Sequence, residues 1–72
     1  MNPQNLSEMA NNIAAFFAAE PVHAEAVRGV ANHIDKFWEP RMKKQLRACI
    51  VKGEEHVDPL VVEAMQSLGV PA

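Results

Sequence analysis

The sequence predicts an all-α fold, a small bundle of about four short helices. Apolar residues recur at spacings of three and four along most of the chain, which is the period of a helix that buries one face. Proline and glycine divide the chain into four such segments, and no segment alternates apolar and polar residues as a strand would. With 72 residues, the chain is expected to form one helical domain, residues 1–72, with a small core of its own.

The first helix is predicted near the N-terminus and has two plausible starts. Its apolar residues at helical spacing are Leu6, Met9, Ala10, Ile13, Phe16 and Phe17. Either Asn2 caps the helix with Pro3 as its first residue, or Asn5 and Glu8 form a pair like a capping box. The helix is expected to end at Glu20, because a residue that precedes proline is displaced from the helical backbone region.

The second helix is expected to open at Pro21 and to end near Glu39. One stripe of it carries Val27, Val30, Ala31, Ile34 and Trp38, with Phe37 beside the stripe. Gly29 lies inside this helix, where glycine costs about 1 kcal/mol relative to alanine. Either this cost is simply tolerated, or the glycine marks a point where another backbone approaches closely, and we favour the second interpretation.

A third helix is predicted from Pro40 to Gly53. Proline is well tolerated as the first residue of a helix but costs about 3 kcal/mol inside one, so a break near Glu39 is favoured over a kinked continuous helix. The inner face of this helix is predicted to carry Met42, Leu46, Cys49 and Ile50. Gly53 is a typical terminator.

The fourth helix is predicted from Pro59, with Asp58 as its cap and Val57 positioned to pack on Val62. Its apolar stripe comprises Leu60, Val61, Ala64, Met65 and Leu68. Gly69 and Pro71 are expected to stop it. We expect the acidic loop residues Glu54 and Glu55 to favour the positive N-terminal end of this helix.

No catalytic, cofactor-binding or metal-binding constellation is predicted, and we expect the chain not to be an enzyme. The single cysteine, Cys49, lies on an apolar stripe, and His56 follows only after a glycine turn, so a Cys/His nucleophile pair is a remote alternative. The histidines lack zinc-ligand spacing, and the acidic residues lack the alternation of a calcium loop. Three widely separated glycines make no phosphate-binding loop.

The charge distribution is uneven although the net charge is only −2. Five of the seven basic residues lie at positions 41–52: Arg41, Lys43, Lys44, Arg47 and Lys52. This basic group is either a solvated helix face or a surface for an anionic partner. The acidic balance disfavours nucleic acid as a partner, and a DNA-binding regulator that uses the third helix ranks last. With no secretory signal or membrane-length apolar run, we expect a cytoplasmic protein that does not bind membranes.

The aromatic residues form two adjacent pairs, Phe16 with Phe17 and Phe37 with Trp38. Adjacent helical positions point in different directions, so the two members of a pair cannot share one narrow stripe. The first alternative is that Trp38 and one phenylalanine of each pair simply fill the core. The second is that one member of each pair faces a partner. Partner-binding candidates gather at the second aromatic pair: Phe37, Trp38, Pro40, Arg41, Met42, Lys44 and Arg47.

Three stretches of the sequence resemble the delta subunit of cytoplasmic NAD-dependent formate dehydrogenase. They are MANNIAAFFAAEP (9–21), VANHIDKFWEPRMKKQL (30–46) and GEEHVDPLVVEAM (53–65). The most specific part is FWEPRM, and the resemblance covers residues 5–68.

The resemblance implies a small accessory subunit without a cofactor of its own. It implies as partners the larger subunits of the enzyme, which carry a molybdenum or tungsten pterin, iron–sulfur clusters and FMN and couple formate oxidation to NAD reduction. The accessory subunit would support assembly, stability or maturation of the active complex. The alternative is a transient chaperone that aids insertion of the molybdenum-pterin cofactor. The same aromatic residues could also mediate self-association of the isolated chain.

Overall fold

A computed structural model describes residues 2–53 and 55–70 of the chain. Its helices are α1 (Pro3–Phe17), α2 (His23–Phe37), α3 (Pro40–Lys52) and α4 (Pro59–Leu68), and the described residues contain no strand. The predicted all-α bundle of four short helices is confirmed. The expectations for Glu54 and Pro71 lie outside the described residues.

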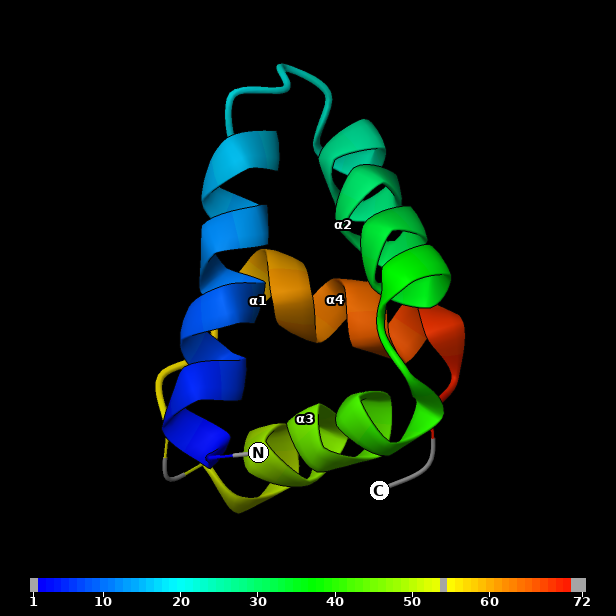
Figure 1. The fold of residues 1–72 in the computed structure, drawn as a ribbon. Helices are drawn as coiled ribbons and strands as arrows, with labels where there is room; N and C mark the ends of the chain where they lie inside the picture. The colour runs from blue at the N-terminus through cyan, green and yellow to red at the C-terminus, as the bar shows by residue number, and fades with distance from the viewer. Residues whose placement is uncertain (1, 54, 71–72) are drawn as a thin grey trace.

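The helices enclose one core in an arrangement about 31 Å long and 20 Å wide. α1 and α2 run antiparallel as two arms joined at one end, α4 crosses behind both, and α3 crosses the open end (Figure 1). α2 packs most extensively on α4, and α1 contacts the other three helices. The buried core residues come from all four helices and the α2–α3 connection: Leu6, Ala10, Ala14, Val30, Ala31, Ile34, Trp38, Leu46, Val61, Ala64 and Met65.

Three helices begin at proline as the sequence predicts. Of the two starts considered for α1, the first is correct, because the Asn2 side chain accepts a hydrogen bond of 2.8 Å from the Gln4 amide. Asp58 caps α4 in the same way, accepting a 2.9 Å bond from the Leu60 amide. The break before Pro40 is also confirmed, since Trp38 and Glu39 have extended backbone angles between α2 and α3.

The connection between α1 and α2 is longer than the sequence predicts. α1 ends at Phe17 rather than Glu20, and the Glu20 amide closes a turn on the Phe17 carbonyl at 3.0 Å. α2 begins at His23 rather than Pro21, because the chain is still extended at Val22, whose carbonyl accepts the first helical hydrogen bonds. The proline therefore marks the turn and not the first residue of the helix.

Gly29 does mark a close approach, but the neighbour is a side chain and not the expected backbone. A β-carbon built at Gly29 would overlap the ring of Phe17. The glycine thus lets the end of α1 lie close against the middle of α2. Its cost in helix propensity is offset by this packing.

Two polar contacts that the sequence does not reveal connect distant segments. The Asn11 side chain donates to the His56 carbonyl at 2.9 Å and accepts from the Asp58 amide at 2.8 Å, so it holds the start of α4 against α1. His23 Nε2 lies 2.8 Å from a Glu63 carboxylate oxygen and links α2 to α4 at the surface. None of the helices in the described residues combines the length and the apolar character that crossing a membrane requires.

Candidate protein-binding surface

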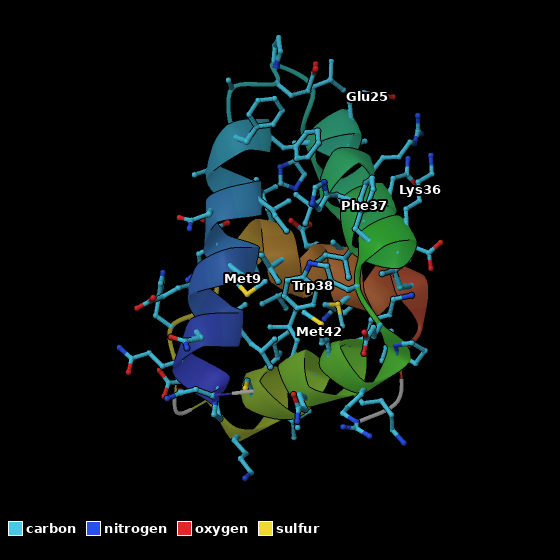
Figure 2. All side chains as sticks on the ribbon, in the orientation of Figure 1. Met9, Glu25, Lys36, Phe37, Trp38 and Met42 are labelled. Atoms are coloured by element: carbon cyan, nitrogen blue, oxygen red, sulfur yellow. The ribbon has the colours of Figure 1, made fainter. Side chains whose placement is uncertain are left out.

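The FWEPRM stretch forms the corner between α2 and α3, where its two aromatic residues point in opposite directions. Trp38 is only 7% exposed and belongs to the core, whereas Phe37 is 73% exposed. Figure 2 shows Phe37 in front of α2 and Trp38 turned towards Met42 between the helices. Of the two alternatives for Trp38, the structure selects the core, so this residue presents almost no surface to a partner. Met42 is half-buried and packs against the same core.

The basic residues near this corner divide into two kinds. Pro40, Arg41 and Lys44 are exposed and Arg47 is half-exposed, so these predicted contact residues are accessible. Lys43 instead turns back to α2, where its ammonium donates to the Asp35 carbonyl at 3.1 Å and lies 3.3 Å from the Asp35 carboxylate. Lys43 therefore ties α3 to α2 and contributes less to the exposed basic group.

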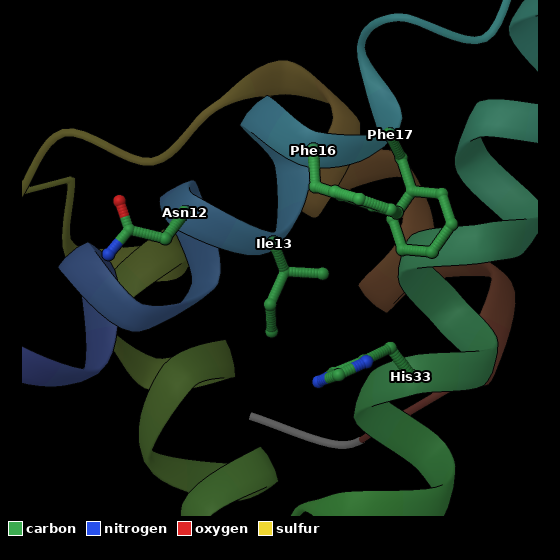
Figure 3. Close-up of a pocket in the computed structure, with 5 residues that line it drawn as sticks. All are labelled: Asn12, Ile13, Phe16, Phe17 and His33. Carbon is green, nitrogen blue, oxygen red and sulfur yellow. The ribbon is translucent and has the colours of Figure 1, made fainter.

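A second exposed aromatic region lies between α1 and α2, at the first aromatic pair and away from the corner where the partner-binding candidates gather. Phe16 is 76% exposed and its ring meets the ring of Phe17 edge-on, with centroids 5.1 Å apart. Together with Asn12, Ile13 and His33, the two phenylalanines line an open pocket of about 380 Å³ (Figure 3). The adjacency of the phenylalanines indicates that one is exposed, but the pocket depends on how α1 and α2 pack.

The pocket and the corner are connected along α2. The His33 ring lies 4.9 Å from the Phe37 ring, one helical turn further on. We call this continuous surface the aromatic strip, and it comprises Ile13, Phe16, Phe17, His33 and Phe37. Such a strip can bind apolar groups, and aromatic side chains often dominate the energy of protein interfaces.

The charges around the aromatic strip are few. α1 has one charged residue, Glu8, which accepts a hydrogen bond from Gln4. On α2, Arg28 pairs with Glu25 at 2.8 Å, whereas Lys36 forms no ion pair among the described residues. Within the described part of the chain, Lys36 is thus an unpaired cationic group next to Phe37.

The described residues contain no cluster of three or more histidine, cysteine or acidic side chains that could hold a metal ion. Cys49 is buried on the inner face of α3, as its position in the apolar stripe predicts. His33 packs on Phe37 and lines the pocket, and His23 pairs with Glu63.

Residues 5–65 match the family model described as the NADH-dependent formate dehydrogenase delta subunit, FdsD. The chain belongs to this family. The match spans most of the 72 residues and includes both aromatic pairs and the corner at Pro40. It confirms the family that the sequence resembles, and it places the chain among the delta subunits of an enzyme with other components. Neither the curated proteins nor the solved structures give a match.

Proposed function

We propose that this chain is a non-catalytic accessory subunit that binds the larger subunits of an NADH-dependent formate dehydrogenase. It supports assembly, stability or maturation of the active enzyme through protein–protein contacts. The observation that carries this proposal is the match of residues 5–65 to the delta subunit family. Formate oxidation and NAD reduction, and the expected molybdenum or tungsten pterin, iron–sulfur clusters and FMN, belong to the other subunits in this proposal. We also propose that the complex is cytoplasmic.

The exposed aromatic residues support a role in binding. An isolated chain leaves most of Phe16 and Phe37 in contact with water, although burying such a side chain contributes about 1.5–3 kcal/mol. A partner that covers them gains this free energy. Contiguous exposed apolar surface of this kind often marks a protein–protein interface.

The proposed contact surface includes the corner between α2 and α3. Phe37 is its apolar centre, and the other exposed or half-exposed members are Pro40, Arg41, Met42, Lys44 and Arg47. Arg41 suits the rim, because its planar guanidinium can pair with a carboxylate through two hydrogen bonds. Trp38 supports this surface from below, since its burial in the core fixes the end of α2.

Subunit stoichiometry tests the proposal. The chain and the larger subunits should be produced together, and the purified active enzyme should be weighed by native mass spectrometry. A permanent subunit gives one copy of the chain per catalytic protomer. Enzyme that lacks the chain, yet depends on it for its pterin content, would instead indicate the transient chaperone. No association and no effect on activity or pterin content would contradict both.

A further inference from the structure

We propose that the pocket between α1 and α2 receives an apolar side chain from a helix of a larger subunit, and that a carboxylate on this helix pairs with Lys36. This inference rests on the proposed function and names the surface and the chemistry of the partner. It extends the predicted contact surface from the α2–α3 corner to the opposite end of the aromatic strip.

The pocket suits one side chain of a partner helix. Its walls are the apolar side chains of Ile13, Phe16 and Phe17 on α1 and the His33 ring on α2. Its volume of about 380 Å³ exceeds that of a single large side chain and lies within the range of natural ligand pockets. In helix-in-groove recognition, an amphipathic helix places apolar anchors from one of its faces into a hydrophobic groove.

The floor of the pocket is held in place before any partner arrives. The Phe17 ring lies directly over Gly29, in space that a β-carbon would occupy. The edge-on contact of Phe16 with Phe17 then orients the outer wall. A preformed pocket needs less ordering on binding, so more of the contact energy appears as affinity.

The charges around the strip favour a partner helix with acidic residues. On the α1 side, the pocket is bordered by the uncharged Asn12. On the α2 side, Lys36 lies beside Phe37 (Figure 2) and has no ion pair among the described residues. The exposed carboxylate of Asp35 is paired with Lys43, and further along the exposed Arg41 and Lys44 outnumber the carboxylate of Glu39, so the rim of this face is positive.

Area and charge argue against a second copy of the chain as the occupant. At roughly 200 Å² for each phenylalanine, the exposed parts of Phe16 and Phe37 sum to about 300 Å². A stable interface covers about 800 Å² on each partner. A two-fold contact between copies would have to extend over the positive rim and bring like charges together, because both copies use the same surface. A larger subunit can cover the strip and the rim with complementary charges.

Affinity measurements with the purified larger subunits test this inference. Phe16→Ala removes a wall of the pocket from an exposed position, and we expect it to raise the Kd at least tenfold. Lys36→Glu should raise the Kd at low salt, with a smaller effect at high salt. The matched controls are Val51→Ala, which truncates an apolar residue that is 61% exposed on α3, and Lys52→Glu, which reverses a charge at the end of the same helix. Both controls should leave the Kd within twofold of wild type.

Photo-crosslinking identifies the occupant. A benzophenone amino acid at position 16 should crosslink to an apolar helix of a larger subunit that carries an aspartate or glutamate, and the same group at position 51 should not. If wild type binds the larger subunits but the Phe16→Ala and Lys36→Glu variants bind equally well, the inference is wrong and the proposed function stands. If wild type does not bind them at all, the proposed function fails. Crosslinking of position 16 to a second copy would show that the occupant is the chain itself.

Discussion

At the scale of single residues, the two aromatic pairs show how far a sequence can predict a surface. The sequence predicts that the members of a pair cannot share one narrow stripe. Phe37 and Trp38 do point apart, whereas Phe16 and Phe17 differ in exposure but bring their rings into edge-on contact. The sequence does not predict which member is buried at the end of α2. Phe37 is the last helical residue, whereas Trp38 adopts an extended backbone that turns its indole into the core. The direction of the indole depends on the angle between α2 and α3, and this angle is set by the packing of the whole bundle.

Substitutions at the second aromatic pair should separate the core from the surface. Trp38→Ala is expected to lower the free energy of unfolding by about 3–5 kcal/mol, because it empties a buried site. Phe37→Ala should change it by no more than about 0.5 kcal/mol, because the ring is largely in water. Urea denaturation followed by circular dichroism measures both values. Equal losses for the two variants would show that Phe37 also belongs to the core.

The effect of Gly29→Ala on stability should have opposite signs with and without the Phe17 ring. In an open helix, Gly29→Ala would stabilise the chain by about 1 kcal/mol through helix propensity. Here the new methyl group overlaps the Phe17 ring, so we expect a net loss of about 1–3 kcal/mol. In a Phe17→Ala background the overlap is gone, and the same substitution should become stabilising. Thermal unfolding of wild type, the two single variants and the double variant gives the coupling free energy between positions 17 and 29. Additive effects on stability would contradict the proposed contact.

At the scale of the helices, the sequence predicts most starts and stops because the signals are local. Proline at the first position, a capping side chain and a terminal glycine each act within one turn. The end of α1 and the start of α2 are the exceptions, since α1 stops at Phe17, before the proline signal, and Val22 provides no side-chain cap. The contact of Asn11 with the loop before α4 could not be predicted, because it joins residues about 45 positions apart.

Asn11 is expected to position α4 against α1. Asn11→Ala leaves the Asp58 amide and the His56 carbonyl without their partner, and the expected loss is about 1–3 kcal/mol in the free energy of unfolding. Asn12→Ala is the matched control, because its exposed side chain makes no such bond to any described residue across the bundle. Hydrogen exchange should also quicken at the Asp58 amide in the first variant. Unchanged stability and exchange would show that the loop is held by other contacts.

At the scale of the whole molecule, the fold class follows from the apolar periodicity, and the family follows from the sequence itself. The candidate surface can be predicted from the sequence only in part. FWEPRM indicates the corner, and Phe37 and Arg41 are exposed there, but the pocket requires Ile13, Phe16 and His33 to meet across two helices. Sequence spacing places each residue on its own helix. Only the packing angle of α1 on α2 brings them together.

We propose that this chain supports an active formate dehydrogenase by binding it through the aromatic strip. The most direct test measures formate-dependent NAD reduction by enzyme from cells that lack the chain and are supplied with wild type or with the Phe16→Ala/Phe37→Ala double variant. Wild type should restore the activity, and the double variant should leave it near the level without the chain while keeping the helical circular dichroism of wild type. Full activity with the folded double variant would contradict the account.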